Sequence, residues 1–269
     1  MFIDSHVHSD ISFDGNSSVD EFVVEGKKQG LDGIIFTEHY DIFDGMNPHD
    51  EKARPFDLCD YEVKLWNSLE KHKGYIRAGV EIGLRPDTPV AVKNASKLFD
   101  YDFIIGSSHI VCGVNVSHDD SFCNARTKEE AYCEYLEEVC ENIRLYGKHF
   151  DVYGHLDYIA RYGTYENKIM YYSEFSSLID KVLRLLIENG CGIEVNTAAY
   201  RQGFDSPHPT FDVIKRFREL GGEIITLGSD AHSPVILGHR FESALALVKE
   251  AGFKRICSFS KRKPIFQNI

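Results

Sequence analysis

The chain has 269 residues, of which 43% are hydrophobic and 27% are charged, and this composition excludes disordered and collagen-like proteins. Its 42 Asp and Glu residues outnumber 30 Lys and Arg residues, and the net charge of −12 argues against a nucleic acid or an anionic membrane as a partner. Seven cysteines form no CxxC pair, no apolar run approaches the roughly 18 residues that span a bilayer, and no signal peptide is evident, so we expect a cytoplasmic protein.

Short apolar runs typical of strands alternate along the chain with longer segments of helical periodicity. The strand-like runs are residues 2–3, 33–37, 75–80, 103–106, 152–154, 192–195, 223–227 and 255–259. The predicted helices include residues 18–29, 127–146, 173–189, 210–220 and 240–251. The first two of these begin with capping boxes, formed by Ser18 with Glu21 and by Thr127 with Glu130.

This alternation of strands and helices predicts an α/β fold. Strand–helix units repeat about seven times without a linker, which favours parallel strands in a closed TIM-like barrel within a single domain, residues 1–269. The alternative is an open doubly wound sheet. The first turn, residues 4–9, lacks the glycine-rich phosphate loop of that fold, so the barrel is preferred.

Imidazole and carboxylate side chains follow the predicted strands at the points where the strands end. They come from six strands and are His6, His8, His39, Glu81, His109, His155, Asp230 and His232. In a barrel, all C-terminal strand ends share the face that carries the active site. A lone histidine is more often a hydrogen-bonded structural residue, but this joint placement indicates a metal centre.

The spacing and the donor types support this interpretation. Residues i and i+2 of an extended segment point to the same side, so His6 and His8 can bind one metal, as can Asp230 and His232. Imidazole and carboxylate without thiolate suit Zn, Fe or Mn. Glu81 is a candidate bridging ligand because a carboxylate has two oxygens to share.

At these residues the chain resembles the PHP (polymerase and histidinol phosphatase) family, and more closely its monofunctional histidinol-phosphatase branch. The matching motifs span nearly the whole chain in the family's order and are residues 4–9, 37–39, 79–81, 106–109, 154–157 and 228–232. Residues 154–163 and 194–201 resemble the phosphate-binding segments of that branch. The resemblance implies a distorted (β/α)7 barrel with two to three divalent ions at the C-terminal ends of the strands.

The resemblance also implies a distribution of ligands among the metals. The first metal would be held by His6, His8, Glu81 and Asp230, the second by Glu81, His109 and His155, and the third by His39 and His232. Some members of the family complete the third site with a histidine from the loop after the first strand. Here Asp14 is the nearest candidate, although an Asp-Gly pair is also a common turn.

The activity implied is metal-dependent hydrolysis of L-histidinol phosphate to L-histidinol and phosphate, through attack of a hydroxide that bridges two metals. Asp230 and His232 are the expected catalytic residues, and Arg161 and Arg201 are expected to bind the phosphate. For both arginines, a surface ion pair is the alternative interpretation. The expected partner is a small phosphate ester, and the oligomeric state stays open.

Four other carboxylates could act around this centre. Asp4 and Asp157 could orient histidines, or they could be ordinary loop residues. Glu194 and Asp205 could help to bind a cationic ester at the rim, although Glu194 could instead lie inside the barrel wall.

Other functions remain possible on the same residues. A phosphoesterase acting on nucleotides or short oligonucleotides would keep the metal site, although the acidic balance weakens it. An amidohydrolase also begins with a His-x-His strand, but many of those enzymes need a bridging lysine at a strand end, and no strand end here offers one. A non-catalytic, degenerate domain would have lost ligands that this chain keeps.

Overall fold

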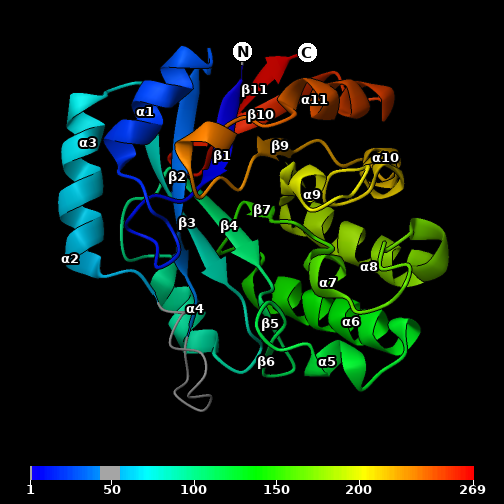
Figure 1. Ribbon diagram of the computed structural model, residues 1–269. Coiled ribbons are helices and arrows are strands. Elements are labelled where there is room, and N and C mark those ends of the chain that lie inside the picture. The colour runs from blue at the N-terminus through cyan, green and yellow to red at the C-terminus, as the bar shows by residue number, and fades with distance from the viewer. Residues whose placement is uncertain (1, 43–54) are drawn as a thin grey trace.

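The computed structural model describes residues 2–42 and 55–269 (Figure 1). Within these ranges seven parallel strands form one sheet in the order β1-β2-β3-β4-β7-β8-β9. Their bounds are Ile3–Val7, Gly33–Tyr40, Ile76–Gly83, Phe103–Ser107, Val152–Tyr153, Gly192–Asn196 and Ile225–Gly228. The backbone N–H of His8 donates to the carbonyl of Ala231 at 2.9 Å, which joins β1 to the segment after β9. The predicted barrel is therefore confirmed, and the open sheet is excluded.

Helices surround the barrel on its outside (Figure 1). They are α1 Val19–Lys28, α2 Leu58–Asp60, α3 Trp66–Lys71, α4 Pro89–Ala95, α5 Ser121–Asn124, α6 Lys128–Tyr146, α7 Tyr158–Tyr162, α8 Tyr172–Asn189, α9 Ala198–Arg201, α10 Phe211–Glu219 and α11 Phe241–Glu250, with a π-helix at Tyr61–Leu65 and a 3-10 turn at Pro234–Ile236. The five predicted helices are confirmed to within one residue at each end, and both capping boxes form. In the described ranges, no helix is both long enough and apolar enough to cross a membrane.

The predicted strand at residues 255–259 exists, but it lies outside the barrel. It is β10, Arg255–Ser260, and it pairs antiparallel with β11, Lys263–Asn268. The rings of Phe259 and Phe103 stack with centroids 4.9 Å apart, and the backbone N–H of Lys261 donates to Asp102, which directly precedes β4. The hairpin therefore covers the N-terminal end of the barrel, opposite the end where the predicted ligands lie.

The aromatic residues of this hairpin should differ in their contribution to stability. We expect Phe259→Ala to lower the free energy of unfolding by about 3–5 kcal/mol, because Phe259 is fully buried and its removal leaves a cavity. Phe266→Ala on β11 is the matched control, since Phe266 is 36% exposed, and its loss should cost about 1 kcal/mol or less. Urea denaturation of both variants measures the difference, and equal losses would contradict this account of the hairpin.

Candidate metal centre

The strand-end residues predicted from the sequence meet at the C-terminal end of the barrel. His6, His39 and Glu81 lie within β1, β2 and β3, and the others directly follow their strands. All are buried except His232, whose side chain is 28% exposed. The backbones of His155 and Asp230 adopt positive φ angles of 23° and 53°, which side chains other than glycine rarely accept. Strain of this kind is often retained at functional sites, where the surrounding structure enforces it.

Glu81 lies at the centre of this cluster, and its two oxygens face different histidines. Oε1 lies 2.9 Å from His155 Nε2 and 3.2 Å from His109 Nε2. Oε2 lies 2.9 Å from His39 Nδ1 and 3.3 Å from His6 Nε2. One carboxylate thus separates two groups of imidazoles, which is the geometry that a bridging ligand requires.

The group that faces Glu81 Oε2 also contains His8 and Asp230. His8 Nε2 lies 3.5 Å from the same oxygen of Glu81 and 3.7 Å from Asp230 Oδ1. His6, His8 and Glu81 offer ligand atoms within 4.8 Å of one another, as do Glu81, His109 and His155. The first triplet contains three of the four ligands predicted for the first metal and the second contains the three predicted for the second metal, and the assignment of ions to them stays a prediction.

Unsatisfied polar atoms test whether this donor set fits metal ions. Buried nitrogen and oxygen atoms are nearly always hydrogen-bonded, because an unpaired one costs free energy. Among the described residues, buried atoms without a hydrogen-bond partner include His6 Nε2, His8 Nε2, His39 Nδ1 and Glu81 Oε2. These atoms converge within the cluster, and divalent cations would satisfy them together.

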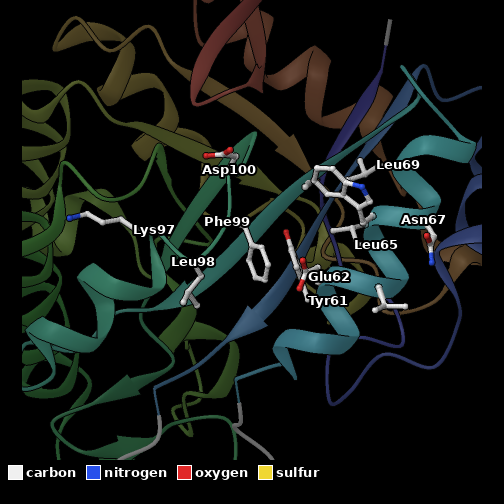
Figure 2. A pocket seen from close by; sticks show the side chains of 12 residues that line it. Tyr61, Glu62, Leu65, Asn67, Leu69, Lys97, Leu98, Phe99 and Asp100 are labelled. Carbon is white, nitrogen blue, oxygen red and sulfur yellow. The ribbon is translucent and has the colours of Figure 1, made fainter.

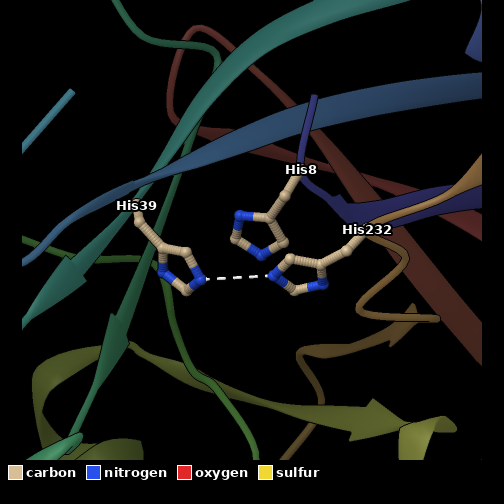
Figure 3. Close-up of side chains that lie close together, drawn as sticks. All are labelled: His8, His39 and His232. Carbon is tan, nitrogen blue, oxygen red and sulfur yellow. Dashed lines mark hydrogen bonds between the residues drawn. The ribbon is translucent and has the colours of Figure 1, made fainter. Parts of the chain in front are cut away.

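A third group lies nearer the surface and comprises His8, His39 and His232 (Figure 3). The Nε2 atoms of His39 and His232 are 3.4 Å apart, and the ring of His8 stacks on both. Asp14 Oδ2 lies 3.1 Å from His232 Nε2 and 3.4 Å from His39 Nε2. The loop after β1 therefore brings Asp14 to the position that the third metal would need.

Two carboxylates outside the predicted ligand set orient the imidazoles. Glu194 Oε1 lies 2.6 Å from His6 Nδ1, and Asp41 Oδ1 lies 2.8 Å from His109 Nδ1. A carboxylate at Nδ1 fixes the proton there and leaves Nε2 free to bind a metal. In both histidines Nε2 faces Glu81. Gly228 leaves room for this arrangement, because a Cβ at that position would overlap Glu194 Oε1.

The charges of the central carboxylates favour cation binding. Burial alone would raise the pKa of Glu81, but the neighbouring imidazoles of His6, His109 and His39 hold it well below its usual range. The pKa of Asp230 is also lowered against the effect of burial, chiefly by His6 and Arg161. Both groups are therefore anionic at neutral pH.

The pKa values of His8 and His6 are shifted in opposite directions by their surroundings. Burial, together with the nearby His39 and His232, lowers the pKa of His8 well below its usual range. Its neutral form is the one that ligates metals. The pKa of His6 is instead raised, because Glu194 and Glu81 outweigh the effect of burial. A cation bound at His6 would take the place of that proton.

The comparisons with known proteins agree with this geometry. The sequence profile of the PHP domain matches residues 4–198. The chain belongs to the PHP family. A probable histidinol-phosphatase of Clostridium acetobutylicum is 30% identical over 97% of this chain and 98% of its own length. The histidinol-phosphatase of Lactococcus lactis is 31% identical over 97% of this chain and 95% of its own.

Solved PHP structures extend the likeness to three dimensions. The crystal structure of histidinol phosphate phosphatase from Lactococcus lactis, complexed with Zn, L-histidinol and phosphate, matches with a TM-score of 0.87 and 29% identity over 98% of both chains. A structure from Listeria monocytogenes has a TM-score of 0.77 at 17% identity, covering 90% of this chain and 99% of its own, and supports the fold alone.

The cavity of this PHP domain opens directly above the cluster. It has a volume of about 470 Å³, and its lining includes His39, His109, His155, Asp230, His232 and Asp14. Residues beyond the cluster complete the lining of the cavity. Tyr158 and Tyr162 come from α7, and Asn115, Ser117 and His118 lie in and after β6. The strand β6, Val114–Asn115, pairs with β5, Ile110–Val111. The cavity can therefore hold a small ester against the donor atoms.

The two predicted phosphate-binding arginines occupy different positions. Arg161 on α7 lines the cavity, its side chain is 9% exposed, and it donates to Asp230 Oδ2 at 3.1 Å. Arg201 on α9 donates to the carbonyl oxygens of Ser229 and Asp230 at 2.9 and 3.1 Å. Arg201 thus supports the backbone that carries Asp230, and its contact with phosphate remains a prediction.

A larger cavity of about 580 Å³ lies elsewhere (Figure 2). It lies between the helical segment made of α2, the π-helix and α3 and the segment before β4. Its walls include Tyr61, Leu65, Trp66 and Phe99. None of the predicted site residues lines it, and nothing in its lining resembles the donor cluster. Size alone therefore does not identify the functional site of this PHP domain.

Other sequence-based interpretations have different outcomes. Glu194 lies inside the barrel against His6 and not at the rim. Asp4 accepts hydrogen bonds from Ser229 and from the backbone N–H of Gly238, so it ties β1 to the segment after β9, and among the described residues it contacts no imidazole. Asp157 does bind an imidazole, that of His208 at 2.9 Å, which lies outside the cluster.

Proposed function

We propose that this protein hydrolyses L-histidinol phosphate to L-histidinol and inorganic phosphate, using two to three divalent ions held by the cluster around Glu81. The observation that carries the proposal is the likeness, over 98% of both chains, to a histidinol phosphate phosphatase solved with Zn, L-histidinol and phosphate. The buried, unpaired donor atoms of His6, His8 and Glu81 support metal binding in this chain itself. Zn, Mn and Fe all suit imidazole and carboxylate ligands.

The ligand assignment follows the groups described above. His6, His8, Glu81 and Asp230 would hold the first ion, Glu81, His109 and His155 the second, and His39, His232 and Asp14 the third. When bound, such ions polarise phosphate oxygens and make water acidic enough to react near neutral pH. In the overall reaction one water is consumed. Its oxygen forms the new bond to phosphorus, and the ester oxygen leaves with a proton as the alcohol.

Protein groups would orient and neutralise the phosphate. Arg161 presents a guanidinium to the cavity, and guanidinium groups bind phosphate oxygens through paired hydrogen bonds. Its contact with Asp230 holds it in place before substrate enters. We assign catalytic roles to Asp230 and His232, which both line this cavity. Arg201 would keep the Asp230 backbone in position.

We also propose a cytoplasmic location, which the free thiols support. All seven cysteines are unpaired in the structure, which supports a reducing compartment such as the cytoplasm.

Metal removal tests the proposal directly. We expect the purified protein to release phosphate from L-histidinol phosphate, to lose this activity after treatment with a chelator, and to regain it when Zn or Mn is added back. The measurement is inorganic phosphate released per minute, with nucleotides and a short oligonucleotide as comparison substrates. Absence of turnover in protein that retains its metal, or faster turnover of nucleotides, would overturn the assignment of the substrate.

A further inference from the structure

Glu38 is a buried carboxylate next to the predicted ligand His39. Its side chain is fully buried, and its hydrogen-bond partners among the described residues are Ser9 and Ser12. Neighbouring residues of a strand point to opposite sides. Accordingly the contacts of Glu38 are with the loop after β1 and not with the Glu81 cluster.

Two serines of this loop satisfy the Glu38 carboxylate. The hydroxyl of Ser9 donates to Oε1 at 2.6 Å, and the hydroxyl of Ser12 donates to Oε2 at 2.5 Å. The backbone N–H groups of both serines also donate to the carboxylate, each at 3.1 Å. A single carboxylate on β2 therefore fixes the backbone of residues 9–12.

The same contacts lead to Asp14. Ser12 accepts a hydrogen bond from the backbone N–H of His39 at 3.0 Å, and its carbonyl accepts one from Gly15 at 3.2 Å. Gly15 lies so close to the carbonyl of Ser9 that a Cβ would overlap it. The turn that contains Asp14 is consequently held tightly against Ser9 and Ser12. Asp14 Oδ2 is thereby kept 3.1 Å from His232 Nε2 and 3.4 Å from His39 Nε2.

We propose that Glu38 is a positioning residue for the third metal position: through Ser9 and Ser12 it holds the loop that presents Asp14 to His39 and His232. The inference rests on the metal centre of the proposed function but not on the identity of the substrate. In this proposal Glu38 acts through Ser9 and Ser12 and is not itself a ligand. Its loss should therefore weaken chiefly the position that contains Asp14. Ser12 Oγ also lies 3.3 Å from His8 Nδ1, but His6, Glu81 and Asp230 would hold the first ion without that contact.

The test is the metal retained by the holoprotein during dialysis against increasing concentrations of a chelator, measured as ions per chain. Glu38→Gln keeps the shape of the side chain but sets an amide against N–H and hydroxyl donors. We expect one ion to be lost from this variant at a roughly 10–100-fold lower chelator concentration than from the wild type, with the remaining ions unaffected. Glu129→Gln, an exposed position on α6, is the matched control and should retain every ion.

Two further variants make the outcome decisive. Asp14→Ala should lose the same ion, and adding Glu38→Gln to it should remove nothing more, because both changes act on one position. Ser9→Ala removes one hydroxyl donor to Glu38 and no contact to a predicted ligand, and it replaces Glu38→Gln if that variant does not fold. The inference is overturned if Glu38→Gln retains metal like the wild type, if all ions leave together, or if Asp14→Ala loses none. Failure of the protein to hydrolyse L-histidinol phosphate would refute the proposed substrate while these metal measurements still decide the role of Glu38.

Discussion

Replacing Glu81 by Gln is expected to lower the hydrolysis of L-histidinol phosphate at least about a thousandfold, which corresponds to about 4 kcal/mol of transition-state stabilisation. The side chain keeps its size, but it loses its charge and one of its two acceptor oxygens. Because the two oxygens face separate groups, one containing His155 and the other His39, an amide cannot serve both. Bound metal should fall along with activity.

The effect of Glu81→Gln can be separated from unfolding. Glu242→Gln, at an exposed position on α11, is the matched isosteric control, and it should retain full activity and metal. Initial rates, metal content and circular dichroism of both variants provide the comparison. A Glu81→Gln protein that is folded and keeps more than about a tenth of the wild-type activity would be incompatible with a bridging role for this carboxylate.

The second large effect is expected at Arg161. Arg161→Met should reduce kcat/KM for the phosphate ester by about 100–1000-fold, the usual cost of removing one preorganised group that stabilises developing charge. Arg161→Lys keeps the charge but not the planar fork of donors, so it should recover only part of this loss. The buried position of the guanidinium, against Asp230 and over the ring of Tyr158, leaves little room for water to replace it.

Inhibition by inorganic phosphate identifies the cause of the loss at Arg161. If the guanidinium binds the phosphate group, the inhibition constant for inorganic phosphate should rise together with KM. Arg144→Met on the exposed surface of α6 removes an equivalent positive charge elsewhere and should change neither constant. An Arg161→Met enzyme with wild-type affinity for inorganic phosphate would show that this side chain acts on something other than the phosphate.

Much of this architecture can be predicted from the sequence, because barrel strands are short apolar runs and their ends carry the polar ligands. His6 and His8 are recognisable from their spacing alone, and the family motifs place Glu81 and His109. The strand at residues 255–259 has the same apolar character as the barrel strands. Its packing against Phe103 places it across the barrel end, and the local sequence does not indicate that contact.

Of the two carboxylates that orient imidazoles, sequence spacing could have indicated only Asp41. Glu194 binds the imidazole of His6 across 188 residues of chain, so no local spacing connects them. Asp41 follows His39 by two residues, and the same alternation that pairs His6 with His8 could have indicated it. Arg161 lines the cavity whereas Arg201 binds backbone carbonyls after β9, and the local sequence of the two segments does not indicate this difference.

The seam between β1 and the segment after β9 has a consequence for the way this protein folds. The contact of His8 with Ala231 joins parts of the chain that are more than two hundred residues apart, and such distant contacts form late and slowly. The first and last members of the predicted ligand set, His6 and His232, lie on opposite sides of that seam. Metal ions that bind only the closed barrel would draw the folding equilibrium toward closure by mass action. The supply of metal during folding would then govern the yield of native protein, as well as the activity of each molecule.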